Sequence, residues 1–204
     1  MKTIRKGFTL VEMLVVIGIV MVLMGASVAG YSSMTKSAEK TKARELVSNV
    51  TTALVALYQR EGSWPKPLIT GNSGEHMLNE KPAFALGRKG YLSLSMEKDQ
   101  NGTPVRLNGY DKFGIVTPWA VTVIKSRGKK VDLSTKIGSK SLQEHILRYA
   151  IDDDGDGFTE VPEIGNSSST KVRATACVWC CSKDGSFRKN DVIKSWTPGM
   201  EVRE

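Results

Sequence analysis

An acidic run in the last third of the chain has the residue types and the spacing of a cation site. Residues 152–163 read DDDGDGFTEVPE and match the pattern D-x-D-x-D-G-x5-E in full. Calcium takes about six to eight oxygen ligands, and carboxylates at alternate positions can converge on one ion while a glycine permits the turn. The run therefore predicts a calcium loop whose ligands are Asp152, Asp154, Asp156, the Phe158 carbonyl, Glu160 and Glu163.

The alternative interpretation of this run is a solvated acidic turn stabilised by its glycines. Neighbouring carboxylates without a cation would repel one another, which favours the ion loop. A helix is expected before the loop, but Pro162 and Gly165 oppose a second helix after it. We therefore expect a structural calcium site rather than a calcium-sensing EF-hand.

The three cysteines could in principle support redox or zinc chemistry. Cys177 and Cys180 have C-x-x-C spacing, and Cys181 follows directly. No second C-x-x-C exists, and His76 and His145 are isolated in the sequence, so a zinc site is not predicted. We expect strand residues with at most one local disulfide, Cys177–Cys180, and one thiol left free or intermolecular. The two histidines are expected to be exposed or half-buried.

One carboxylate stands inside an apolar segment at the start of the chain. A basic leader ends at Gly7, and the run from Phe8 to Ala29 has a single charge, Glu12. As a helix this run would be about 33 Å long, enough for a bilayer core of about 30 Å. A carboxylate there costs about 2.5–3.5 kcal/mol, so a partner is expected. Cleavage after Gly7 would create an amine on Phe8 that could pair with Glu12 of a neighbouring parallel helix.

The residues from Lys6 to Glu12, KGFTLVE, resemble the class III signal of type IV pilins and of the pseudopilins of type II secretion systems. The resemblance implies that a prepilin peptidase cuts between Gly7 and Phe8 and methylates the new amine. It also implies that the helix anchors the subunit in the bacterial inner membrane, with the N-terminus cytoplasmic and the head periplasmic. The helix would later pack in the core of a homo-oligomeric filament, with Glu12 as the assembly carboxylate. Other pseudopilins and an inner-membrane assembly platform are the further implied partners.

Two other interpretations of this segment stay open. An ordinary secretory signal peptide would use the small residues Ser27, Val28 and Ala29 as its cleavage site. The apolar run is longer than a usual h-region of about 7–15 residues, and Glu12 stands where such a region is most apolar. A plain membrane anchor gives no reason for Glu12.

A second stretch, residues 179–196, resembles the C-terminal calcium loop of major pseudopilins. Asp184 and Asp191 match acids of that loop, and Asn190 stands where the first of two paired acids is expected. Positive charge at Arg188 and Lys189 makes this the weaker of the two calcium loops. A calcium-free turn held by hydrogen bonds is the alternative. Residues 111–119 also resemble a turn between sheet strands in the same family.

The elements that must position these residues follow from periodicity. No proline or glycine interrupts residues 32–60, and apolar residues recur there at helical spacing, so a helix from Phe8 to about Arg60 is expected, its second half packed on the head. Gly62 and Pro65 end it. Residues 65–90 are interpreted as a loop with a short helix. Strands are expected at 91–95, 105–107 and 119–124, with a final strand at 174–181 closing the sheet. The capping box from Ser141 to Glu144 predicts a helix over 142–150.

The fold expected is α+β: a long N-terminal helix packed on a small antiparallel sheet head, the pilin fold, with C-terminal acidic loops. The expected segments are a leader (1–7), a membrane or filament-core helix (8–30), a soluble helix half (31–62) and the head (63–204). The net charge is +8 without a run of five cations, so nucleic acid is not an expected partner, and no catalytic constellation is found. The predicted function is a non-enzymatic pseudopilin subunit of type II secretion with a calcium-stabilised head. The alternative is a membrane-tethered or secreted calcium-dependent binding module.

Overall fold

The computed structural model describes residues 9–69, 75–128, 131–162, 169–188 and 191–202. The chain forms two compact units, Met1–Lys40 and Thr41–Glu204, and the helix α1 (Leu10–Glu61) contributes residues to both. The predicted segment boundaries at residues 30 and 62 stay a prediction. The long N-terminal helix followed by antiparallel sheets confirms the expected α+β class.

In the first unit, α1 presents large apolar side chains to its surroundings. Leu10 is 81% exposed and Val22 is 73% exposed, and the side chains between them include Met13, Leu14 and Ile17 at more than half exposure. Within the part of the chain that the structure describes, no helical segment meets the length and hydropathy required to cross a membrane. Phe8, where the helix was expected to begin, lies outside the described residues.

In the second unit, α1 buries one stripe of side chains in the main core. The stripe has the three- and four-residue spacing of one helix face, which confirms that this half of the helix packs on the head. Its fully or almost fully buried members are Ala43, Val47, Val50, Leu54 and Leu57. The helix ends at Glu61, and Gly62 follows with a φ of 69°, a conformation that glycine adopts without strain.

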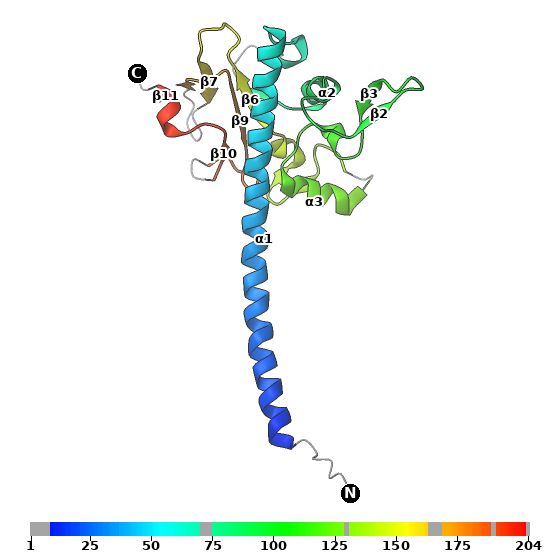
Figure 1. Cartoon of the computed structure of the whole chain (residues 1–204), viewed down its shortest axis with the longest axis vertical. Helices are drawn as coiled ribbons and strands as arrows, with labels where there is room; N and C mark the ends of the chain where they lie inside the picture. Colours follow the sequence, from blue (N-terminus) through cyan, green and yellow to red (C-terminus); the bar gives the residue numbers. More distant parts are fainter. Residues whose placement is uncertain (1–8, 70–74, 129–130, 163–168, 189–190, 203–204) are drawn as a thin grey trace, which may run out of the picture. The chain divides into compact units, whose positions relative to one another are not determined.

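The main sheet has four antiparallel strands in the order β1-β6-β9-β10. They are β1 (His76–Met77), β6 (Arg148–Ile151), β9 (Ala176–Cys180) and β10 (Ile193–Lys194). Every residue of β9 is buried because both faces of this strand are covered. Val178 and Cys180 join the core that contains the α1 stripe, whereas Cys177 and Trp179 pack on the other face with Trp196. In Figure 1, β6 and β9 follow the head portion of α1.

Smaller elements complete the head. A second sheet has the order β11-β8-β7, from β7 (Thr159–Pro162), β8 (Ser169–Val172) and β11 (Glu201–Val202). Two further antiparallel pairs are β2 (Met96–Lys98) with β3 (Pro104–Leu107) and β4 (Lys136–Ile137) with β5 (Lys140–Ser141). The short helices are α2 (Glu80–Arg88) and α3 (Pro118–Arg127), and 3-10 turns cover Lys66–Leu68, Asp111–Phe113, Leu142–His145 and Pro198–Met200.

Two element predictions are wrong because short apolar runs fit more than one structure. The run 119–124 is not a strand but part of α3, which begins with extended Thr117 and with Pro118 in its first turn. The predicted helix over 142–150 is a single 3-10 turn, Leu142–His145, followed by strand β6. A capping box contributes only about 1 kcal/mol, and pairing of β6 with the buried strand β9 overrides it.

Other boundaries also differ from the expectation. Residues 91–95 are irregular and the strand β2 begins at Met96, whereas the strand expected at 105–107 is confirmed within β3. Residues 111–119 form a 3-10 turn and the start of α3 instead of a turn between strands. The strand expected at 174–181 is confirmed as β9, but it lies in the interior of the sheet and β10 and β11 follow it.

Candidate functional site

The first turn of α1 contains a partner for Glu12 within the same chain. The Thr9 backbone N–H and the Thr9 hydroxyl both donate to Glu12 Oε2, at 2.7 and 2.8 Å. The Glu12 backbone N–H donates in return to Thr9 Oγ1 at 3.3 Å. This reciprocal arrangement is a capping box, and it also places a negative charge at the positive end of the helix dipole. The isolated carboxylate of the apolar helix is therefore hydrogen-bonded before any second subunit is present.

Sequence reasoning missed this role of Thr9, although the T-x-x-E spacing that signals it was available. The same spacing was instead used to predict a capped helix at Ser141, where the structure shows no side-chain cap. Glu144 there pairs with Arg148 at 2.8 Å. Gly7 and Phe8, the predicted cleavage residues, lie outside the described residues, so the pairing of Glu12 with a Phe8 amine stays a prediction.

The acidic loop after β6 brings three predicted calcium ligands together. Each of Asp152, Asp154 and Asp156 offers an oxygen within 4.8 Å of the other two. Backbone N–H groups hold these carboxylates: Asp152 accepts from Gly155 at 2.7 Å and from Gly157 at 2.9 Å. Both glycines have positive φ, at 76° and 83°, which lets the loop turn back on the first carboxylate. Three of the predicted ligands thus converge from local geometry alone.

The loop is fixed to the core at its first ligand. Trp64 Nε1 donates to the Asp152 carbonyl at 2.6 Å, and the Asp152 N–H donates to the Thr175 carbonyl at 3.0 Å. The Trp64 ring stacks on Tyr58 of α1 at a centroid distance of 4.8 Å. These contacts tie the start of the loop both to the strand beside it and to the last turns of α1.

The rest of the predicted ligand set is not assembled in this way. Glu160 lies exposed in β7, opposite Lys171 of β8, and Phe158 is half-buried just before that strand. Glu163 lies outside the described residues. The predicted helix before the loop is wrong, because β6 precedes it and β7 follows it. The motif is therefore a strand–loop–strand unit and not an EF-hand.

The second acidic stretch forms a hydrogen-bonded turn. The Asp184 carboxylate accepts from the Ser182 hydroxyl and from the Ser186 N–H, the latter at 3.0 Å, and these donors lower the pKa of Asp184. Asp191 is exposed, and Asn190 lies outside the described residues. Among the described residues, only Asp152, Asp154 and Asp156 form a group of three metal-ligating side chains. Calcium binding by Asp184, Asn190 and Asp191 stays a prediction.

The structure does not contain the Cys177–Cys180 disulfide that the C-x-x-C spacing allowed. All three cysteines are free and buried, and residues three apart on a strand point to opposite faces of the sheet. Cys177 accordingly packs with Trp179 and Trp196, whereas Cys180 packs in the α1 core. Burial raises the pKa of Cys177 and of Cys181 to about 12, so these groups stay protonated thiols near neutral pH.

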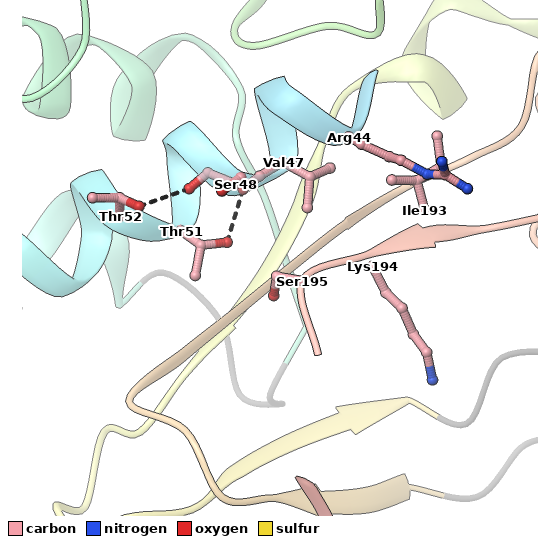
Figure 2. A pocket seen from close by; sticks show the side chains of 8 residues that line it. All are labelled: Arg44, Val47, Ser48, Thr51, Thr52, Ile193, Lys194 and Ser195. Carbon is pink, nitrogen blue, oxygen red and sulfur yellow. Dashed lines mark hydrogen bonds between the residues drawn. The ribbon is translucent and has the colours of Figure 1, made fainter. Parts of the chain in front are cut away.

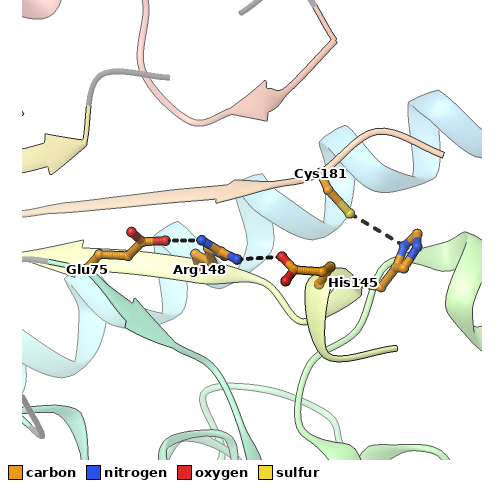
Figure 3. A network of polar contacts seen from close by, with 5 residues as sticks. Glu75, His145, Arg148 and Cys181 are labelled. Carbon is orange, nitrogen blue, oxygen red and sulfur yellow. Dashed lines mark hydrogen bonds and ion pairs between the residues drawn. The ribbon is translucent and has the colours of Figure 1, made fainter. Parts of the chain in front are cut away.

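A polar network connects β6 to the segment after β9. Arg148 pairs with Glu75 at 2.5 Å and with Glu144 at 2.8 Å, and Figure 3 shows Glu75 and Arg148 pointing toward each other. The Arg148 guanidinium also lies 4.1 Å from the centre of the Phe187 ring. Arg148 thus joins three parts of the head that are far apart in the sequence.

His145, in the same view, is wholly buried, so the expectation that it is exposed or half-buried is wrong; His76 is half-buried as expected. The Nδ1 of His145 lies 3.0 Å from Thr117 Oγ1 and 3.5 Å from Cys181 Sγ, while the Nε2 of His145 is buried without a hydrogen-bond partner. Burial lowers the pKa of His145, which favours the neutral imidazole. Burial also raises the pKa of Cys181, which favours a protonated thiol beside the neutral imidazole.

Figure 2 shows a pocket of about 220 Å³ between α1 and β10. Three of its hydroxyls are engaged: those of Thr51 and Thr52 donate to helix carbonyls, and Ser195 Oγ accepts from the Val178 N–H. Arg44 and Lys194 are the cations of the lining, and Lys194 pairs with Glu201 at 2.7 Å. Among the described lining residues, no nucleophile lies beside a general base.

Known proteins resemble part of the chain. A family profile described as "Prokaryotic N-terminal methylation motif" matches residues 2–28. The chain is 36% identical over 66 residues to the type IV major pilin protein PilE of Neisseria gonorrhoeae, covering 32% of this chain and 40% of that protein. It is 35% identical over 65 residues to a fimbrial protein of Neisseria meningitidis serogroup B, covering 32% and 38%. The matches span about two fifths of these relatives. No solved structure matches the chain.

Proposed function

We propose that this type IV pilin-like protein is a structural subunit that polymerises through its N-terminal helix into the pseudopilus of a type II secretion system. The observation that carries the proposal is the capped start of α1, where Thr9 and Glu12 bind each other at the head of an exposed apolar helix. The methylation motif over residues 2–28 supports processing, and the named pilin relatives support a filament. The narrower assignment to type II secretion rests on the resemblance of the C-terminal stretch to major pseudopilins.

The exposed side chains from Leu10 to Met24 give the thermodynamic reason for anchoring and assembly. Each large apolar side chain that leaves water contributes about 1.5–3 kcal/mol. More than ten such side chains are exposed on this segment, so covering them is worth more than the usual stability of a whole domain, about 5–15 kcal/mol. Lipid covers them while the subunit resides in the inner membrane, with its N-terminus cytoplasmic and its head periplasmic. Neighbouring helices cover them in the filament.

Glu12 passes from one partner to another in this scheme. The two hydrogen bonds from Thr9 give the carboxylate partners within its own helix turn until a second subunit arrives. Prepilin peptidase cleaves between Gly7 and Phe8 and methylates the new amine. The amine of a neighbouring subunit then pairs with Glu12 and draws the incoming helix into register.

The first test is the N-terminus of the mature chain. Sequencing should begin at a methylated Phe8; a start at Gly30 would identify an ordinary signal peptide, and an intact start a plain anchor. Glu12→Gln should leave the subunit in the membrane but abolish its incorporation into filaments. Glu45→Gln, an exposed glutamate of the same helix, is the matched control and should assemble normally. Wild-type incorporation of the Glu12→Gln chain would contradict the assembly role.

We propose further that one calcium ion binds the acidic loop and stabilises the head. The loop supplies Asp152, Asp154 and Asp156 in convergent positions, and Trp64 fixes its first residue. At a hundredfold excess over Kd a bound ion adds about 2.7 kcal/mol, which raises Tm by about 5–10 °C for a chain of this size. Asp154→Asn should remove most of this shift. Asp153→Asn, in the same loop but outside the cluster, should retain it, and an equal Tm in calcium and in EGTA would refute the site.

A calcium-dependent binding module is the second candidate function, and the convergent acidic loop is the observation that favours it. Such a module would need the loop but neither cleavage at Gly7 nor Glu12. Full activity of a Glu12→Gln chain in secretion, together with calcium binding, would support the module and exclude the filament subunit.

A further inference from the structure

Charge in the head is divided between two segments of opposite sign. Residues 125–140, KSRGKKVDLSTKIGSK, carry six lysines or arginines against one aspartate, a net +5 in a chain whose total is +8. Residues 152–163 carry six acids and no cation, a net −6. The rest of the chain carries a net +9, with 23 cations and 14 acids interspersed, so these two segments stand out as local concentrations of opposite charge.

The basic segment forms one exposed surface at the end of α3 and on the β4–β5 pair. We define the basic surface as Lys125, Arg127, Lys136 and Lys140, all exposed. Arg127 Nη1 donates to the Lys136 carbonyl at 3.5 Å, which holds the helix end against the strand pair. Lys129 and Lys130 belong to the same segment of sequence and lie outside the described residues.

These cations are not neutralised within the described part of the chain. The ion pairs found there use other cations, namely Lys89, Arg106, Arg148 and Lys194. The acid inside the segment, Asp132, accepts hydrogen bonds from the hydroxyls of Ser134 and Thr135, and these donors lower its pKa. Lys125 lies 5.4 Å from the centre of the Tyr110 ring, a contact that leaves its charge in place.

The acidic loop presents the opposite charge at the other end of the head. Asp153, Asp154 and Asp156 are exposed in the loop, and Glu160 is exposed in β7. The Thr117 N–H, at the start of α3, donates to the carbonyl of His145 just before β6, whereas Asp152 comes directly after β6. An extended strand rises about 3.3 Å per residue, so β6 separates the two surfaces. Figure 1 shows α3 and the loop between β6 and β7 at opposite ends of this unit.

We propose that the basic surface of one copy binds the acidic loop of a second copy of this chain. The inference rests on the proposed filament subunit and names a contact between heads. Because the two surfaces differ and lie at opposite ends of the head, the contact is head-to-tail and leaves one free surface of each sign. Such an interface builds an open filament and not a closed dimer. The charges are exposed, so the contact sets register and encounter rate and weakens with salt, since the screening length is about 8 Å at 0.15 M.

Two observations favour a second copy over another anionic partner. The matching acidic surface is present on the same chain in equal number, so every subunit brings both halves of the contact. A polymerising subunit also holds the heads at high effective concentration, where weak charged contacts become occupied. Binding of the basic surface to lipid headgroups is the competing outcome of the test.

The test uses zero-length carbodiimide cross-linking of the full-length chain, with equal amounts of ¹⁵N-labelled and unlabelled copies. Mass spectrometry should find mixed-isotope peptides that join Lys136 or Lys140 to Asp153 or Glu160. Lys136→Glu with Lys140→Glu should lower filament yield about tenfold at about 0.15 M salt, as expected for reversed rim charges. Lys81→Glu with Lys98→Glu, two exposed lysines elsewhere on the head, is the control with the same charge change and should have little effect.

Exchanging the charges of the basic surface and the acidic loop shows whether the partner is a second copy of the chain. Adding Asp153→Lys and Glu160→Lys, both outside the Asp152–Asp154–Asp156 cluster, to the Lys136→Glu, Lys140→Glu chain should restore filament yield, with cross-links now joining positions 153 and 136. Thermal melting must show that each variant is folded. Filaments that lack these cross-links would overturn the inference alone. So would a Lys136→Glu, Lys140→Glu chain that loses anionic-vesicle binding as much as filament yield and whose filament yield the charge exchange does not restore. Cross-linked copies that never form filaments would overturn the proposed function alone.

Discussion

Trp64→Phe isolates one hydrogen bond that joins the acidic loop to the core. The change removes the indole N–H that donates to the Asp152 carbonyl at 2.6 Å but keeps an aromatic ring to stack on Tyr58. The carbonyl then lies buried without this donor, and an unsatisfied buried polar group costs about 1–3 kcal/mol. For a domain of this size about 1 kcal/mol corresponds to about 2–4 °C in Tm, so we expect a loss of about 2–12 °C.

The assay is urea unfolding followed by far-UV circular dichroism, in EGTA and in saturating calcium. Trp196→Phe is the control, because its indole N–H donates at 3.1 Å to Glu201, a partly exposed acceptor that also binds Lys194. The control should be less destabilising and should leave the response to calcium unchanged. Trp64→Phe should in addition weaken calcium binding, since it releases the first ligand of the loop. A Trp64→Phe chain within about 0.5 kcal/mol of wild type would refute the reasoning, because a surface substitution alone reaches that size.

Three further predictions follow from buried groups of the head. Burial lowers the pKa of His145 below its usual 6.5, so on acidification the unfolded chain binds the histidine proton before the folded chain does. The free energy of unfolding should therefore be highest above about pH 6.5 and fall as the pH drops towards the folded pKa. His145→Gln should flatten this pH dependence in urea titrations from pH 8 to 5. Gly114→Ala should abolish folding or cost several kcal/mol, about 3 or more, because the new Cβ would lie 2.1 Å from the Leu78 carbonyl oxygen at a φ of 97°; a normal melting curve would contradict this. Iodoacetamide at pH 8 should label none of Cys177, Cys180 and Cys181 until the chain is unfolded, because burial keeps their thiols protonated. Fast labelling of the native protein would show that the sheet opens.

Local spacing in the sequence was sufficient for the long helix and for the acidic loop. Residues 43–57 of α1 repeat apolar side chains every three or four positions without glycine or proline, so the buried stripe follows from helical geometry alone. The aspartates at 152, 154 and 156 converge because a loop with glycines at 155 and 157 turns back on itself within a few residues. In both cases the interacting groups are neighbours along the chain.

Only the tertiary structure decided the features that depend on distant partners. Residues 148–151 became a strand because they pair with 176–179, and this pairing overrode a capping box that a local analysis interprets as a helix start. The alternation of β9 between two cores separated Cys177 from Cys180, and contacts with Thr117 and Cys181 buried His145. The sequence by itself determined helix periodicity, the processing motif and loop spacing, because these are local. Strand pairing, burial and the bonding of thiols depend on which segments meet, and that is fixed by packing of the whole head.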